Sequence, residues 1–217
     1  NNGKPMLNGL MTVADYKLSP STSLLLVRKL EPVRESIPKL CKRLSSSHEY
    51  VREEAVAGLG HVAKISAAER DEVLENKVLE KIAAMCAKEA KLLTLQSCAR
   101  TIATLCNGKP SPSYAHMKPA IQSLGNLLCF SDAEVLLHST KGILCLSDGL
   151  EETVASLIND EKIAYGGICP RLVELVAHEN EFIVETVLRC LFNISLTDKD
   201  GEAKTANGVE GRKVLAR

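Results

Sequence analysis

The sequence predicts an all-helical protein built as a solenoid of stacked repeats, and three observations lead to this fold class. First, amphipathic segments recur along the chain with a period near 40 residues. Second, aromatic residues make up only 3% of the chain, with no Trp, so Leu, Val, Ile, Ala and Cys must fill the core. Third, no segment has the alternating pattern that is typical of a strand.

Each repeat contains a short amphipathic segment followed by a longer helix. The short segments, marked by Pro38, Leu79, Pro119 and Pro170, follow one another at steps of 41, 40 and 51 residues. The longer helices give steps of 43, 41 and 48 residues between their central apolar residues, Leu59, Ile102, Ile143 and Leu191. Both series lengthen at the last repeat, which predicts one insertion at Asn159–Tyr165. The predicted longer helices are Tyr50–Lys64, Leu92–Cys106, Ala133–Ser147 and Glu181–Ser195.

A third, short helix precedes some of these pairs, at Ala67–Asn76 and Leu150–Asn159, whereas the proline-rich segment Lys109–Ser113 predicts a loop in its place. Three helices in about 42 residues predict an armadillo-type right-handed α-solenoid of about four repeats with partial end repeats. We expect one domain over residues 1–217. Its predicted repeats are 34–66, 67–108, 109–149 and 150–196, with ragged end repeats at 1–33 and 197–217, as in a piece of a longer solenoid.

Charge and hydropathy argue against several classes of partner. The 27 basic and 27 acidic residues cancel, which is not the balance of a general nucleic-acid or membrane-surface binder. No apolar run approaches the roughly 18–20 residues that cross a bilayer, and the N-terminus lacks the pattern of a secretion signal. We therefore expect no nucleic acid and no membrane as partner.

The eight cysteines have apolar neighbours and form no Cys-x-x-Cys pair, so we interpret them as small packing residues in a reducing compartment. The histidines are scattered without metal-ligand spacing, which predicts no metal. No phosphate-binding glycine loop or nucleophile elbow is present. Cys106 and Cys145, the thiols that a nearby histidine could activate, fall in predicted helix cores. The sequence therefore predicts no enzyme and no cofactor.

Four segments resemble importin-α, the armadillo adaptor of nuclear import, and the likeness covers residues 34–196. The turns Leu-Cys-x-Gly-Lys before Pro110 and Leu-Ser-Asp-Gly at Gly149 come in the order of the family's central repeats. The resemblance implies a concave groove that binds an extended basic peptide, and a protein of the cytoplasm and nucleus. The segments are EEAVAGLGHVA (Glu53–Ala63), TIATLCNGK (Thr101–Lys109), STKGILCLSDG (Ser139–Gly149) and GICPRLVELV (Gly167–Val176).

In the family, the groove carries a ladder of Trp and, four residues later, Asn. Indole rings hold lysine side chains, and Asn side chains bind the peptide backbone. Most of this ladder is replaced here, and Asn193 alone keeps the family's residue. By the resemblance, the Trp positions are Ala57, Arg100, Lys141 and Arg189, and the Asn positions are His61, Thr104, Cys145 and Asn193.

Two interpretations of these substitutions stay open. Arg100, Lys141 and Arg189 could stack along the groove and attract an acidic or phosphorylated peptide, or they could be solvated or paired, as Arg189 with Glu185 one turn earlier. His61 could hold a peptide or simply pack. The sequence therefore predicts an importin-α-like adaptor for an import signal, with an acidic-peptide scaffold of a signalling or cytoskeletal complex as the alternative.

The family recruits its β-type carrier through a basic arm that precedes the repeats. Residues 1–30 contain only four basic residues, which is far from such a cluster. We therefore expect the carrier-binding arm to be absent from this chain. The four residues are Lys4, Lys17, Arg28 and Lys29.

Overall fold

The described part of the chain consists of α-helices and their connections, without a strand. The computed structural model describes residues 33–88, 91–159 and 167–196, all within the unit Pro32–Arg217. The predicted all-helical class is confirmed. The helices are α1 (Val33–Arg43), α2 (Glu49–Ala63), α3 (Ala67–Glu75), α4 (Val78–Lys88), α5 (Leu92–Cys106), α6 (Tyr114–Leu127), α7 (Ala133–Ser147), α8 (Glu151–Asn159), α9 (Ile168–Leu175) and α10 (Glu181–Ser195).

Three of the four predicted long helices, now α5, α7 and α10, begin and end at the predicted residues, and α2 lies one residue earlier than predicted. The short helices α3 and α8 also form, and the segment 109–113 before α6 is not helical. The predicted repeat boundaries stay a prediction. The predicted insertion and both ragged ends lie almost entirely outside the described residues.

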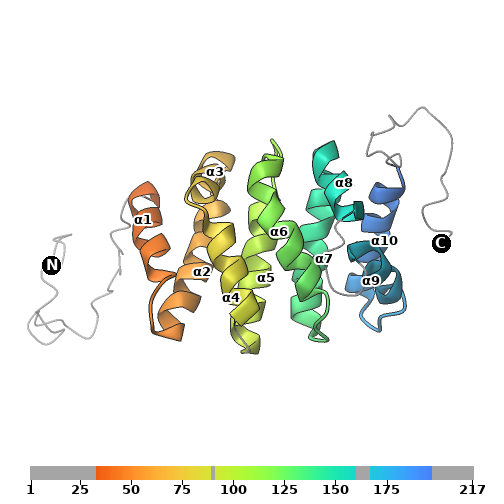
Figure 1. Cartoon of the computed structure of the whole chain (residues 1–217), viewed down its shortest axis with the longest axis horizontal. Helices are drawn as coiled ribbons and strands as arrows, with labels where there is room; N and C mark the ends of the chain where they lie inside the picture. The colour runs from red at the N-terminus through yellow and green to blue at the C-terminus, as the bar shows by residue number, and fades with distance from the viewer. Residues whose placement is uncertain (1–32, 89–90, 160–166, 197–217) are drawn as a thin grey trace, which may run out of the picture. The chain divides into compact units, whose positions relative to one another are not determined.

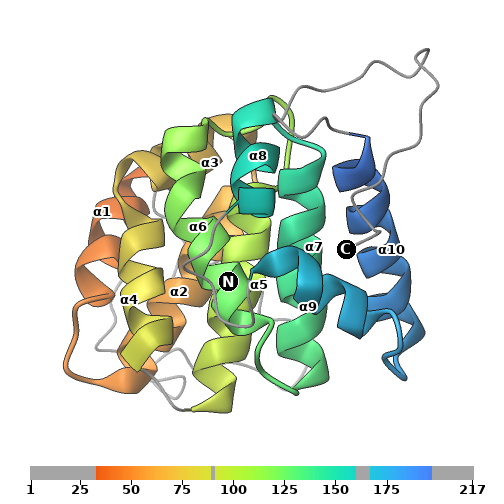
Figure 2. The ribbon, with the colours of Figure 1, turned by 45° about the vertical axis from the view of Figure 1, so that its right-hand side comes forward.

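The helices form two layers that follow chain order (Figure 1). In one layer α2 packs on α5, α5 on α7 and α7 on α10; in the other, α4 packs on α6. Each layer also packs on the other, through α1 on α2, α6 on α7 and α9 on α10. Figure 2 shows α3 and α8 at one edge of these layers. This arrangement is the predicted α-solenoid.

The core lies between the two layers and is almost entirely aliphatic. The residues that align the long helices occupy its centre: Leu59, Ile102 and Ile143 are fully buried, and Leu191 is 9% exposed. All eight cysteines are free thiols that are buried or half-buried, as their apolar neighbours predict. The thiol of Cys190 shows the effect of this environment, since burial raises its pKa to about 12.

Close contact between successive long helices depends on small residues. Thr101 on α5 donates a hydrogen bond to the carbonyl oxygen of Val56 on α2, at 3.2 Å. A Cβ atom at Gly60 would lie 2.8 Å from Oγ1 of this threonine, so the glycine permits the approach of α2 to α5. A Cβ at Gly142 on α7 would lie 3.4 Å from Cα of Ala103 on α5 and 2.8 Å from a methyl group of Leu124 on α6, so this glycine permits close packing on both helices.

A buried arginine ties α3 to the loop that follows α5. Arg70 is 1% exposed. It donates to the carbonyl oxygens of Asn107 at 3.0 Å and Pro110 at 2.8 Å, and its Nη2 lies 2.7 Å from a carboxylate oxygen of Asp71. Gly108, between the two acceptors, has φ of +116°, and a Cβ there would lie 2.7 Å from the guanidinium. The conformation of the loop therefore depends on the hydrogen bonds from Arg70, and the close approach of Arg70 depends on the glycine in the loop.

We expect Arg70→Met to lower the free energy of unfolding by about 2–4 kcal/mol, because it removes the donor to two carbonyl groups and the partner of Asp71. Urea denaturation followed by circular dichroism measures this change. Arg189→Met is the matched control, since Arg189 and Glu185 are 66% and 69% exposed and 4.0 Å apart; we expect less than about 0.5 kcal/mol. Equal effects of the two substitutions would contradict the structural role of Arg70.

Candidate functional site

The eight residues predicted for the groove come in pairs four residues apart on α2, α5, α7 and α10, the four helices that pack consecutively. Not one of the eight is buried, so all lie on the solvent side of this layer, which we call the groove face. Their role in binding stays a prediction. His61, Arg100, Lys141 and Arg189 are exposed, and Ala57, Thr104, Cys145 and Asn193 are half-buried.

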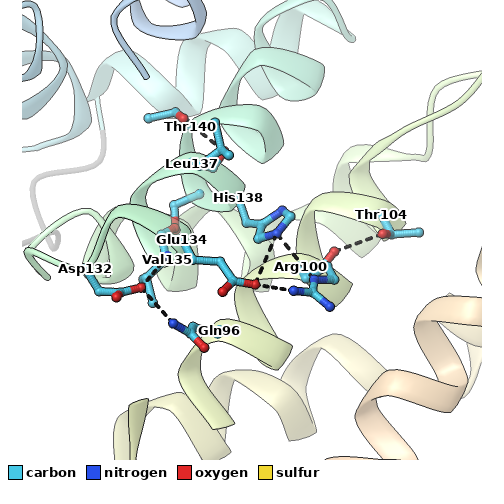
Figure 3. A network of polar contacts seen from close by, with 10 residues as sticks. Gln96, Arg100, Thr104, Asp132, Glu134, Val135, Leu137, His138 and Thr140 are labelled. Atoms are coloured by element: carbon cyan, nitrogen blue, oxygen red, sulfur yellow. Dashed lines mark hydrogen bonds and ion pairs between the residues drawn. The ribbon is translucent and has the colours of Figure 1, made fainter. Parts of the chain in front are cut away.

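A polar network occupies the middle of the groove face, between α5 and α7 (Figure 3). Arg100 forms an ion pair with Glu134, and its Nε donates to Nε2 of His138 at 3.3 Å. Nε2 of His138 lies 3.9 Å from the Glu134 carboxylate. Arg100 is therefore paired across two helices, a contact that intrahelical spacing does not predict.

His138 is neutral in this setting for a physical reason. Burial lowers its pKa, and the positive charges of Arg100, Lys141 and Lys64 lower it further, while Glu134 acts in the opposite direction. Because the neutral ring has a free lone pair on one nitrogen, Nε2 can accept the hydrogen bond from Arg100. The low pKa of His138 thus follows first from its burial and second from the positive charges around it.

The other two cations of the predicted row differ from Arg100. Arg189 lies 4.0 Å from Glu185, which confirms the predicted pairing along α10. Lys141 has no ion pair among the described residues. Of the three cations, Arg100 is thus held by a neighbouring helix and Arg189 is weakly paired within its own helix. Lys141 has no counterion among the described residues.

The residues at the Asn positions also differ in what they can offer a ligand. The hydroxyl of Thr104 donates to the carbonyl oxygen of Arg100 at 2.9 Å, so its proton is used within α5. The amide of Asn193 donates to Oγ of Ser147 at 3.1 Å, which links α10 to α7. Burial and the neighbouring Asp148 raise the pKa of the Cys145 thiol, which keeps it protonated.

A cavity of about 630 Å³ opens on the groove face between α7, α10 and the loop after α5. It brings together Cys145, Arg189 and Asn193, three of the predicted residues, with Leu188 and Phe192. Sequence reasoning missed the last two, which are 51% and 62% exposed. Their signal in the sequence is that both are apolar and lie next to predicted groove residues, Leu188 beside Arg189 and Phe192 beside Asn193.

The groove face offers little to catalysis. Burial raises the pKa of the Cys106 thiol far above neutrality, as it raises that of Cys145. In the described residues no group of three or more His, Cys, Asp or Glu side chains is placed to hold a metal ion.

The described helices also include none that is both long and apolar enough to cross a membrane.

Comparison with known proteins identifies relatives over most of the chain, although no family model matches it. Importin subunit alpha-1b of Oryza sativa subsp. japonica is 36% identical over 163 residues, 75% of this chain and 29% of the relative. Importin subunit alpha-2 of Arabidopsis thaliana is 34% identical over 145 residues, 67% of this chain and 26% of the relative. The chain thus spans less than a third of the length of these relatives.

Solved structures with the same fold include designed proteins. A designed armadillo repeat protein superposes with a TM-score of 0.63 at 17% identity, over 76% of this chain and 67% of its own. A computationally designed armadillo repeat protein for modular peptide recognition gives a TM-score of 0.60 at 21% identity, over 74% of this chain and 68% of its own. At this identity the likeness shows the fold. With the importin relatives, the comparisons support a divergent importin-α-like armadillo protein.

Proposed function

We propose that this chain is a non-enzymatic adaptor that binds an extended peptide segment of a partner protein along its groove face. The observation that carries the proposal is the groove face itself. Four consecutively packed helices each place two residues, spaced four apart in the sequence, at equivalent positions on this face, and none of these residues is buried. A peptide in extended conformation presents its side chains at regular intervals, so a face with a repeated spacing can bind it residue by residue.

The relatives suggest the class of partner. They are named importin subunits alpha, and one structural neighbour of the same fold is a designed armadillo repeat protein in complex with the peptide (KR)4. By this likeness the bound segment would be a basic nuclear import signal, and the chain would act in nuclear protein import, in the cytoplasm and the nucleus. Asn193 supports this function, because it keeps the family's residue at a position that binds peptide backbone.

A specific observation favours a second ligand class. Arg100, Lys141 and Arg189 stand where the family has indole rings, and Lys141 has no counterion among the described residues. A lysine-rich peptide loses the cation–π attraction at these positions and meets like charge. The second candidate is therefore a scaffold, in a signalling or cytoskeletal complex, that binds acidic peptides.

A direct comparison of the two ligand classes tests both candidates. We expect a fluorescently labelled acidic peptide to bind the full chain with an affinity that falls as salt rises, and a lysine-rich import signal to bind more weakly. Lys141→Glu should reduce the affinity for the acidic peptide by roughly tenfold, because attraction becomes repulsion. Fluorescence anisotropy at two salt concentrations measures these affinities.

Lys118→Glu is the control, because Lys118 is exposed on α6, outside the groove face, and we expect no effect there. Tight, salt-resistant binding of the lysine-rich peptide would contradict the acidic-ligand candidate and support the import-signal function. Absence of binding by both peptides would contradict the adaptor function itself.

Restoring the ladder is an independent prediction. Ala57→Trp, Arg100→Trp and Lys141→Trp, combined with His61→Asn and Thr104→Asn, should strengthen binding of the basic peptide. Each indole adds about 0.5–2 kcal/mol of cation–π attraction. A control with a single indole at Lys118 should leave the affinity unchanged. If the restored ladder stays inactive while circular dichroism shows an intact fold, the groove face has been assigned to the wrong side of the helices.

A further inference from the structure

A small cavity beside the groove face is lined by positive charge. It has a volume of about 210 Å³ and lies between the end of α2, the start of α3 and the loop after α5. Lys64, Arg70 and Lys109 line it, and no acidic residue does. Its other lining residues are Ala63, Ser66, Ala67, Thr104, Asn107 and Gly108.

The three cations differ in how firmly they are held. Arg70 is fixed by its hydrogen bonds to the loop, and Asp71 balances its charge. Lys109 lies 3.2 Å from Asp148, but both side chains are at least 70% exposed, so this pair contributes little and can exchange partners. Lys64 has no ion pair among the described residues. The ammonium group of Lys64 is thus available to a ligand, and that of Lys109 becomes available when it leaves Asp148.

No carboxylate lines the cavity, so none offsets the positive charge of its lining residues from inside. Asp71 pairs with Arg70, and Asp148 pairs with Lys109. Glu69 accepts a hydrogen bond from the Ser66 hydroxyl at the start of α3. All three carboxylates have partners, and none lines the cavity.

Two other cavities in the described residues offer a contrast. The larger groove cavity has Asp148 among its lining residues beside Lys109 and Arg189. The cavity between α6 and α8 combines Lys118 with Glu152. In both, a carboxylate that lines the cavity offsets the positive charge, whereas the small cavity lacks one.

We propose that the small cavity is an anion site that binds a phosphate group, held by Lys64 and Lys109 beside the fixed guanidinium of Arg70. Lysine ammonium groups bind phosphate as point charges and can adjust to its position. The volume admits a tetrahedral anion with some of its water. The phosphate can belong to a phosphorylated Ser or Thr of a peptide, since Thr104 and Lys109 also border the groove face, or it can be free inorganic phosphate.

The site is tested with inorganic phosphate and the full chain, by following backbone amide chemical shifts in a titration at constant ionic strength. We expect saturable shifts at Ser66, Thr104 and Gly108. Lys64→Glu and Lys109→Glu should each weaken binding by roughly tenfold, because each removes a charge-assisted contact. Lys118→Glu is the matched control and should bind as the unmodified chain does. Shifts that do not saturate, or equal affinities in all three variants, would overturn the proposal.

A second arm separates the two sources of phosphate. A phosphoserine peptide that binds more tightly than both free phosphate and its unphosphorylated form, and loses this gain in Lys64→Glu, identifies a phosphorylated peptide as ligand. Equal affinities of peptide and free phosphate identify the free anion. This site does not depend on the adaptor function: phosphate binding without any peptide binding would contradict that function alone, and peptide binding without phosphate binding would contradict the anion site alone.

Discussion

Each of the long helices α2, α5 and α7 buries one of its faces against the long helix that follows it, and the other features of this chain depend on that contact. Val56 on α2, Ala99 on α5 and Thr140 on α7 are aligned by the repeat, and all three are fully buried. Thr140 also accepts a hydrogen bond from the Cys190 thiol through its carbonyl oxygen, at 3.6 Å. The aligned residue on α10 is Leu188, which is 51% exposed because no described helix follows it.

The exposed side of α10 contributes to the groove cavity. Leu188 occupies the position on α10 that corresponds to buried residues on α2, α5 and α7, and it lines the groove cavity together with Phe192. Solvent-exposed rings and aliphatic side chains of this size favour contact with another apolar surface. The groove face is therefore charged in its middle, around Arg100, and at α10 it combines the charged Arg189 with the apolar Leu188 and Phe192.

The sequence predicts most of the fold because one periodicity governs it. Apolar residues at helical spacing locate the long helices, and their repetition identifies the central core residues, such as Ile102. It does not single out Arg70, whose carbonyl partners lie 37 and 40 residues away. The pair of Arg100 and Glu134 escaped prediction for the same reason, because it joins adjacent repeats across 34 residues. Contacts within one helix, such as Arg189 with Glu185, are those that spacing can predict.

The cross-repeat pair also decides how an acidic ligand can approach the groove face. A carboxylate that binds Arg100 must displace Glu134, which is already in contact with the guanidinium, so the exchange of one carboxylate for another brings little net gain. Lys141 and Lys64 require no such exchange, and both act on His138. If the groove face binds an acidic peptide, as proposed, we expect Lys64 and Lys141 to contribute more to the affinity than Arg100 does.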